Sequence, residues 1–495
     1  MTFFKFTKTQ IEKAKSSAIV KAINRIICSP WGIGILGVLT VLAFAFTREV
    51  EFYTFVVIYT LYVALFADDL SPIMPLFILC YVTPSVSNNP GMSDQGLFYG
   101  NSGIYLAGIL SLAVVALLFR IALDKSFGLR RLFTTKRKLI WGILALGISY
   151  LLSGILHEQY FEYAQRNLLF AFIQFASVFL LYFILSASVK WDKFDPDYFA
   201  WIGLMMGFVV SAELICIYLS NNVIIDGSIS RDHIFSGWGC YNNIGAVIGM
   251  SVPFAFYFAA RKKHPSIFLL IACFLMAMIA LSGSRGSLMG ALVAFPFCFI
   301  YTDFNGYYKK EYRITSLTLL CIIAIVALLF PYQLAPIFNQ IPNIAHMEGS
   351  SLIMNDSGRI DMYKAGWQIF LNNPIFGQSF YPIEFELCSF AQLDSFTSFF
   401  PPRWHNTIIQ MLASCGIVGM IAYAYHRIDT IRMHFKKRTH ITAYALLFII
   451  TLCFMSLLDC HFFNVGPTLF YSITLAVMEF CKDKPLKSKK QISMQ

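Results

Sequence analysis

The feature that most constrains this chain is a series of apolar stretches, each about 17 to 23 residues long, that recurs over nearly its whole length. An apolar helix of about 20 residues spans the hydrocarbon core of a bilayer. The sequence therefore predicts an all-α polytopic integral membrane protein with about 14 transmembrane helices, in a range of about 12 to 14. The predicted spans lie near residues 31–47, 52–66, 72–86, 103–123, 138–156, 167–188, 199–219, 240–260, 266–282, 287–302, 314–331, 406–425, 440–458 and 463–481.

The composition agrees with this prediction. Apolar residues make up 57% of the chain and charged residues 13%, which excludes an ordinary soluble domain. Residues 1–30 differ from the rest because they read as a basic amphipathic helix without the cleavage site of a signal peptide. We expect this segment to lie on the cytoplasmic surface of the membrane.

Lysine and arginine collect in segments that all fall on one side of the predicted spans. Short basic loops of this kind stay in the cytoplasm. We therefore expect a multi-pass protein of the cytoplasmic (inner) membrane with both termini in the cytoplasm. The net charge of +11 then follows from topology and contact with membrane lipids, and it requires no nucleic-acid partner. The basic segments are residues 1–30, 124–138, 190–193, 261–264, 307–313, 426–440 and the tail 482–495.

One outward loop, residues 332–405, is much longer than the others. We expect three membrane regions: an N-terminal transmembrane bundle at 31–220, a central region at 221–425 that contains this loop, and C-terminal helices at 426–481. The loop is too apolar and aromatic for a disordered segment, so we expect a function on the outer face. A helix along the outer surface is predicted from Ile360, Tyr363, Trp367 and Phe370, which recur at helical spacing behind the capping residues Asp356, Ser357 and Gly358.

Three arginines fall on the predicted outer side: Arg231, Arg285 and Arg359. A guanidinium group matches phosphate oxygens with a rigid fork of donors and a charge that does not titrate. Predicted helix starts at Gly286 and Asn406 add free amide groups at the same interface, so this face is predicted to bind a diphosphate. Simpler interpretations exist, in which Arg285 snorkels from the end of a span and the other two arginines are solvated loop residues.

The stretch PPRWHN, residues 401–406, places a titratable ring at the edge of a predicted span. The prolines stop any preceding helix, Asn406 is predicted to cap the next one, and Trp404 is predicted to anchor the interface. His405 then lies ahead of the first helical turn. The positive end of the helix disfavours imidazolium, so the ring is expected to be neutral and able to act as a general base. The alternative is a histidine that only fills an interfacial gap.

The remaining polar residues give weaker signals. His157, Glu158, Glu162 and Arg166 form an outward patch that either helps to bind an acceptor or is simply a solvated loop. No outward cluster of acidic residues and histidines has the spacing of metal ligands, so we expect no metal and no cofactor.

Three segments, taken in order, resemble the O-antigen ligase and O-antigen polymerase superfamily of bacterial envelope proteins: SGSRGSLMGALVAF, GRIDMYKAGWQIFLNNPIFGQS and WHNTIIQMLASCGIVGM. The resemblance covers residues 225–425 and includes the upstream run SRDHIFSGWGCYNNIGAVIGMSVPF. It implies a GT-C-like, membrane-embedded glycosyltransferase that acts at the outer leaflet without a metal or a nucleotide sugar. The implied donor is a glycan on undecaprenyl diphosphate, and the glycan passes to an acceptor hydroxyl.

The resemblance also implies roles for single residues. His405 is similar to the family's histidine that activates or positions the acceptor, while Arg231 and Arg359 are similar to the arginines that engage the donor diphosphate. Arg285 matches the arginine of the SRG run and is expected in the same site. Ser379 departs from the family, which often has glycine there, and Ile409 replaces a more usual leucine.

The motifs leave the acceptor open. A ligase transfers to a lipid A core, a polymerase to another lipid-linked glycan, and a third possibility is a protein hydroxyl. We favour the polymerase, with a chain-length regulator as a further partner, because nothing in the chain indicates a core-oligosaccharide acceptor. The alternative class is a flippase for lipid-linked oligosaccharides. Transporters usually show internal repeats and ionisable residues at the midplane, whereas here the polar residues gather at one face.

Overall fold

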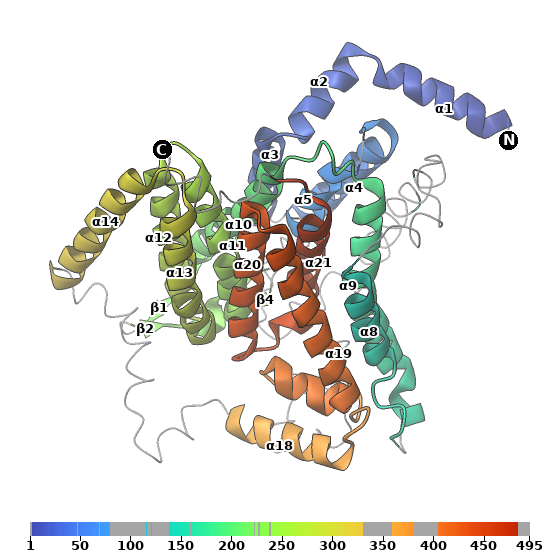
Figure 1. The fold of residues 1–495 in the computed structure, drawn as a ribbon, viewed down its shortest axis with the longest axis vertical. Helices are drawn as coiled ribbons and strands as arrows, with labels where there is room; N and C mark the ends of the chain where they lie inside the picture. Colours follow the sequence, from blue (N-terminus) through green and yellow to red (C-terminus); the bar gives the residue numbers. More distant parts are fainter. Residues whose placement is uncertain are drawn as a thin grey trace.

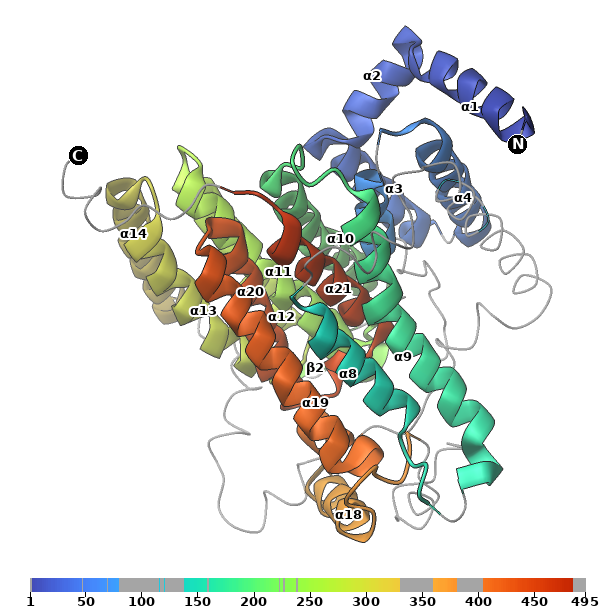
Figure 2. The same ribbon diagram turned by 45° about the vertical axis from the view of Figure 1, so that its right-hand side comes forward.

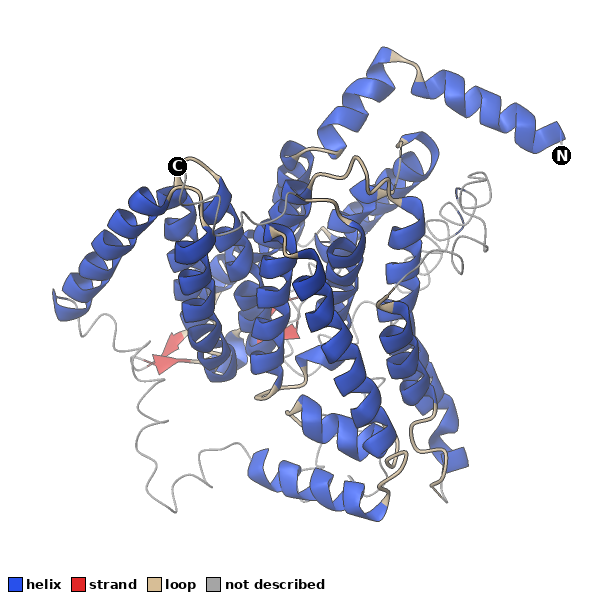
Figure 3. Ribbon diagram, in the orientation of Figure 1, coloured by secondary structure: helices blue, strands red, loops and turns tan. Residues whose placement is uncertain are grey.

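A computed structural model describes residues 2–46, 48–68, 70–79, 115, 120, 138–157, 160–221, 223–225, 228–236, 239–329, 359–380 and 404–483. Helices account for most of this part of the chain (Figure 3), as predicted. They are α1 (Thr2–Lys15), α2 (Ala18–Ile27), α3 (Pro30–Ala45), α4 (Glu49–Phe66), α5 (Met74–Leu79), α8 (Ile140–Leu151), α9 (Tyr160–Ser188), α10 (Pro196–Ser220), α11 (Tyr241–Arg261), α12 (Pro265–Leu281), α13 (Arg285–Asn305), α14 (Lys309–Leu329), α18 (Arg359–Asn372), α19 (Thr407–Lys437), α20 (His440–Ser456) and α21 (Val465–Phe480). Short 3-10 turns are η1 (Ser71–Ile73), η2 (Arg231–His233) and η4 (His461–Phe463).

The prediction of an all-α chain is wrong in one detail. The loop between α10 and α11 folds back on itself twice and forms two antiparallel ladders of two residues per strand. In the first, β1 (Ile224–Ile225) pairs with β2 (Ser228–Ile229); in the second, β3 (Phe235–Ser236) pairs with β4 (Gly239–Cys240). Gly239 adopts a φ of +96°, which suits the second reversal.

Helix α11 stands at the centre of the bundle (Figure 1) and packs against α10, α12, α13 and α20. Its most apolar window is 94% buried, as expected of a helix that is surrounded by other helices. On the other side, α8 packs between α9 and α19, and α9 packs along α21 (Figure 2). The apolar core therefore runs continuously from α3 to α21.

Contacts at one end of the bundle join α10 and α11 to the end of α2 and to the last described residue, Asp483. The Tyr198 hydroxyl at the start of α10 donates to the Ile27 carbonyl at 3.0 Å. Arg261, which ends α11, pairs with both Asp197 and Asp483. Helix α18 lies at the opposite end, across the bundle axis (Figure 1). Helices α1 and α2 project from the bundle, and α2 meets α3 at a bend of 73°.

Among the described residues, four helices are long and apolar enough to cross a membrane: α10, α11, α13 and α19. The bent pair α2–α3 raises this number to five. The predicted count of about 14 spans is therefore not confirmed. The predicted span 103–123 and the end of span 72–86 lie outside the described residues apart from two positions.

Helix α19 differs most from its prediction. The predicted span ended at residue 425 and a basic cytoplasmic loop was expected at 426–440, whereas α19 continues to Lys437. His426 and Arg427 consequently lie inside the bundle and contact aromatic rings there. The first turns of α19 are separated from the rest by a break at Gly416, where φ is +64° and ψ is −159°.

The segment 374–379, from the sequence NPIFGQS, fills the break in α19. An unbroken helix would bond the amide of Ile417 to the carbonyl of Ala413. Here the Ile417 amide donates to the Pro374 carbonyl at 2.8 Å, and the Ala413 carbonyl accepts from the Gln378 amide at 2.9 Å. Glycine is required at position 416, because a Cβ there would lie 2.4 Å from the Ile375 carbonyl oxygen. The break thereby fixes the C-terminal side of α18 to α19.

We expect Gly416→Ala to destabilise the protein by about 2–4 kcal/mol, since an added methyl group meets backbone atoms and alanine disfavours positive φ. Gly34→Ala is the matched control: Gly34 lies in α3, and nothing lies within 4 Å of an added Cβ. Thermal unfolding of both purified variants measures the difference. Equal melting temperatures would show that the break tolerates a side chain.

Ser379 carries a second local strain. Its φ is +113°, a region that glycine occupies far more readily than serine. The departure from the family's glycine therefore affects the backbone, as its position in the sequence suggested. We expect Ser379→Gly to retain stability or to raise it by up to about 1 kcal/mol, whereas Ser379→Ala keeps the strain. A destabilised glycine variant in thermal unfolding would contradict this account.

Candidate functional site

The turn between α20 and α21, residues 457–460, is the point at which the candidate site is assembled. Its sequence is Leu457, Leu458, Asp459 and Cys460. Helix α20 ends at Ser456 and η4 begins at His461, so the carbonyls of Leu457 and Leu458 have no place in a helical ladder. Helices α13, α18 and α19 each begin beside this turn, as the following contacts show.

His405 lies immediately before α19, as predicted. Its backbone has a φ of +50°, an uncommon conformation that persists only where the surroundings hold it. The Tyr363 hydroxyl of α18 donates to the His405 carbonyl at 3.1 Å. The ring is held from the other side, where Nδ1 lies 3.2 Å from Oδ1 of Asp459. The side chain of His405 is 32% exposed and that of Asp459 only 9%, so the ring reaches outward from a buried carboxylate.

The charge state of Asp459 fixes the tautomer of His405. Burial raises the pKa of the Asp459 carboxyl, but the hydrogen bond from His405, the charges of His461 and His405 and the Cys460 amide lower it more. The net effect is a pKa well below the usual range of an aspartic acid. An ionised carboxylate only accepts hydrogen bonds, so Nδ1 carries the proton. In the neutral ring, Nε2 is then the atom with a free lone pair.

Asn406 caps α19, as predicted. Its Oδ1 accepts from the amides of Ile408 and Ile409 at 2.8 and 3.2 Å. Its Nδ2 donates to the Leu457 carbonyl at 2.9 Å, which ties the start of α19 to the turn.

The prediction that Trp404 anchors the membrane interface is wrong. Trp404 is completely buried and packs with Ile369 and Ala413 in a small core of its own. Helix α18 covers it, because a Cβ on Gly366 would lie 3.2 Å from the indole ring. The tryptophan therefore joins α18 to α19 and holds the backbone next to His405.

Two of the predicted arginines lie beside the turn. Arg359 is the first residue of α18, and its Nη1 donates to the Leu458 carbonyl at 3.0 Å. Arg285 is the first residue of α13, which is capped by Ser284. A Cβ on the next residue, Gly286, would lie 3.2 Å from Cβ of Leu458, so the first turn of α13 packs directly on the turn.

Arg231 does not belong to a helix that begins at the turn; it lies in η2, in the loop between α10 and α11. Its guanidinium lies 5.6 Å from the centre of the Tyr241 ring, and its Cγ lies 3.3 Å from a Cβ built on Gly283. Gly283 precedes Arg285 by two residues, so Arg231 borders the start of α13. The structure thus brings it to the helix that carries Arg285.

Buried amides and hydroxyls hold these helix starts together. Ser284 donates to Oδ1 of Asn242 at 3.0 Å, and Asn464 donates to Oδ1 of Asn243 at 2.7 Å. The start of α11 is therefore bonded both to α13 and to the segment before α21. Asn242 and Asn243 belong to the upstream run SRDHIFSGWGCYNNIGAVIGMSVPF that carries part of the family resemblance.

The arrangement suits an anion. The positive ends of α13, α18 and α19 meet at one turn, and two of these helices begin with an arginine. A phosphate group would gain from both the amides and the guanidinium groups. The ring of His405 stands beside this positively charged region.

Comparison with known proteins is consistent with this geometry. A family model described as O-antigen ligase matches residues 267–424, a range that contains Arg285, Arg359 and His405. The matched part of the chain is therefore similar to the O-antigen ligase family. An O-antigen ligase of Escherichia coli (strain K12) is 23% identical to it over 205 residues. That match covers 39% of this chain and 46% of the relative, so the chain spans less than half the length of that O-antigen ligase.

Asp459 is the residue that sequence reasoning missed. It lies outside the range matched by the O-antigen ligase model, and 54 residues separate it from His405. One signal was present: Asp459 is the only acidic residue in the short turn between the last two predicted spans.

The outward patch around His157 is only partly described. Nε2 of His157 lies 3.1 Å from Nε2 of Gln378, so this ring contacts the segment that fills the α19 break. Glu158 lies outside the described residues, and the side chains of Glu162 and Arg166 do as well. Within the part of the chain that the structure describes, no three His, Cys, Asp or Glu side chains are grouped as metal ligands.

The low pKa of Asp459 makes a contribution to stability that depends on pH. A carboxyl whose pKa is lower in the folded state stabilises the fold above its unfolded pKa of about 3.9, and this stabilisation is lost as pH falls below that value. We expect the melting temperature of the wild type to fall between about pH 5 and pH 3, and Asp459→Asn to lack part of that fall. Thermal unfolding across this range tests it. Asp192→Asn, at an exposed turn, should behave like the wild type.

Proposed function

We propose that this protein is a membrane glycosyltransferase that moves a glycan from a polyprenyl-diphosphate donor to an acceptor hydroxyl at the outer leaflet. The observation that carries the proposal is the pairing of His405 with Asp459 on the turn that also binds Arg359. The O-antigen ligase match supports glycan ligation as the class of reaction. The membrane is the cytoplasmic one, with the site on its outer side and both termini in the cytoplasm.

The donor diphosphate would lie against the starts of α13 and α18. Arg285 and Arg359 would contact its oxygens, and Arg231 would complete the positive rim. During transfer the bond between the anomeric carbon and the diphosphate oxygen breaks, and negative charge grows on the leaving diphosphate. Fixed cations and helix ends stabilise that charge without reorganisation, so this part of the reaction needs no metal.

His405 would act on the acceptor. Its Nε2 takes the proton of the acceptor hydroxyl while the hydroxyl oxygen bonds to the anomeric carbon. The resulting imidazolium is stabilised by Asp459, which remains ionised throughout. At the end of this step the acceptor carries the glycan, His405 holds the proton, and polyprenyl diphosphate leaves.

The acceptor distinguishes the remaining candidates. A lipid A core acceptor makes the protein a ligase, a lipid-linked glycan makes it a polymerase, and a protein hydroxyl makes it a protein O-glycosyltransferase. The comparisons name ligases, whereas the composition favoured the polymerase. The reducing end of the product separates the three.

The test is transfer by the purified chain from a synthetic undecaprenyl-diphosphate oligosaccharide to candidate acceptors, with products detected by mass. We expect His405→Ala to lower the rate by at least about 100-fold and Arg359→Lys by about 10- to 100-fold. Chelator should leave the wild-type rate unchanged. His264→Ala and Arg432→Ala are the controls, since both side chains are exposed, His264 just before α12 and Arg432 in the last part of α19, far along the helix from its start at the turn.

Full activity of the His405 variant would remove the general base from the mechanism, and inhibition by chelator would require a metal. If the wild type forms no product with any acceptor but moves the intact donor across liposomes, the protein is a transporter.

A further inference from the structure

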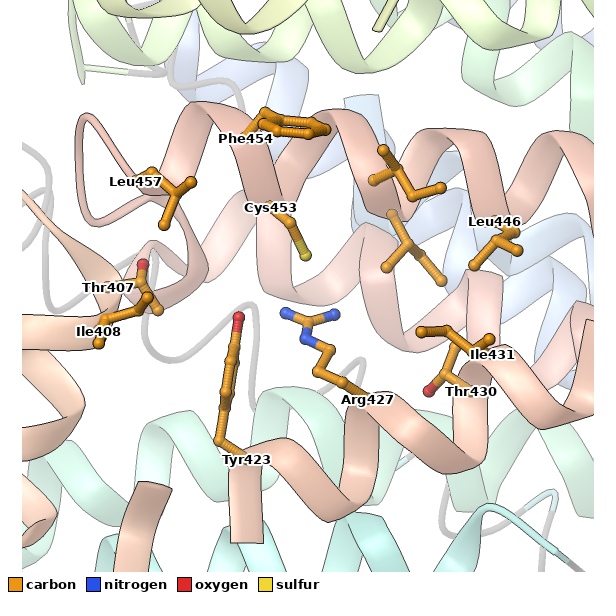
Figure 4. Close-up of a pocket in the computed structure, with 12 residues that line it drawn as sticks. Thr407, Ile408, Tyr423, Arg427, Thr430, Ile431, Leu446, Cys453, Phe454 and Leu457 are labelled. Atoms are coloured by element: carbon orange, nitrogen blue, oxygen red, sulfur yellow. The ribbon is translucent and has the colours of Figure 1, made fainter. Parts of the chain in front are cut away.

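A groove lies between α19 and α20 (Figure 4), with a volume of about 290 Å³. Leu446, Ile450 and Phe454 of α20 form one wall together with Leu457, the residue after the helix. Helix α19 forms the other with Thr407, Ile408, Tyr423, Arg427, Thr430 and Ile431. Helix α19 is long and apolar enough to cross a membrane and α20 is a shorter apolar helix, so we expect the groove to face the interior of the bilayer.

One end of the groove is the candidate site. Thr407 and Leu457 line this end. Thr407 directly follows Asn406, whose side chain donates to the Leu457 carbonyl. The other end reaches Leu446, eleven residues along α20. At 1.5 Å per residue the groove is about 16 Å long, the extended length of roughly three isoprene units. An amphiphile with its charged group at the turn would lay its chain here.

Arg427 is the one cation among the residues that line this groove. Its guanidinium lies 4.3 Å from the ring centre of Phe462 and 4.8 Å from those of Tyr423 and Tyr471. Nε and Nη1 are buried without a hydrogen-bond partner among the described residues. Figure 4 shows the group directed into the space between the helices, next to Cys453.

Burying a charged side chain such as Arg427 between apolar helices costs free energy, and such a residue usually has a function. Arg427 is stabilised by π electrons rather than by a carboxylate, because in the described part of the chain three rings surround it and no ion pair includes it. The side of the Arg427 guanidinium that faces the groove also favours a partner with π electrons. A polyprenyl chain offers a double bond in each isoprene unit, whereas a saturated acyl chain offers none.

We propose that the α19–α20 groove binds the isoprenoid chain of the lipid carrier and that Arg427 selects unsaturated chains over saturated ones. The choice of ligand rests on the proposed function, because the diphosphate at the turn places the chain at the mouth of the groove. The apolar walls supply most of the binding and Arg427 supplies the discrimination.

The experiment measures binding of undecaprenyl phosphate, without a glycan, to the purified full chain by native mass spectrometry. Its fully hydrogenated analogue is the comparison. We expect the wild type to prefer the unsaturated lipid by about fivefold, and Arg427→Met to reduce that ratio to about one. Ile450→Trp, which fills the groove, should weaken binding of both lipids. Ile421→Trp is the matched control, because Ile421 is 62% exposed on α19 and does not line the groove.

Binding that Ile450→Trp leaves unchanged would overturn the proposed groove. An unchanged ratio in Arg427→Met would overturn its role in selection, and thermal unfolding shows whether each variant is folded. A geranyl-diphosphate donor adds a second check: if Arg427 instead binds the diphosphate, Arg427→Met loses affinity for this short donor as well. His405→Ala should bind the lipid normally, so loss of transfer without loss of binding separates the proposed function from the groove.

Discussion

The site depends on the turn at residues 457–460 remaining open to hydrogen bonds from other helices. Asn406 bonds to the carbonyl of Leu457, Arg359 to that of Leu458, and His405 to the side chain of Asp459. Each donor comes from the beginning of α18 or α19. The carbonyls that a helix end leaves unsatisfied are thus the acceptors that place the functional residues.

A second constraint holds this arrangement in place from the other side. The break at Gly416 separates the first turns of α19 from the rest of the helix, and the segment 374–379 bonds to both edges of the break. Trp404 is buried beneath α18, and Tyr363 of α18 bonds to the backbone of His405. Consequently α18, the filling segment and the start of α19 form one layer. The uncommon backbone of His405 is maintained by this layer.

Much of this could be predicted where the cause is local. The helical spacing of Tyr363 and Trp367 predicted α18, and Asn406 was recognised as a cap because its chemistry acts within three residues. Asp459 was missed because its partner is 54 residues away. Trp404 was misplaced because a tryptophan at a membrane edge and one beneath a covering helix follow the same local pattern. The extent of α19 was underestimated because the arginine of its second half is stabilised by rings from other elements, among them Phe462.

Backbone acceptors give the 457–460 turn an unusual relation to its own sequence. Leu457 and Leu458 serve as hydrogen-bond acceptors through carbonyls, which every amino acid possesses, so replacing their side chains leaves those bonds available. Side-chain scanning would therefore assign little importance to the two residues whose carbonyls hold Asn406 and Arg359. A one-residue insertion or deletion would instead turn both carbonyls away from their donors. The length of this turn, more than its composition, is what the site requires.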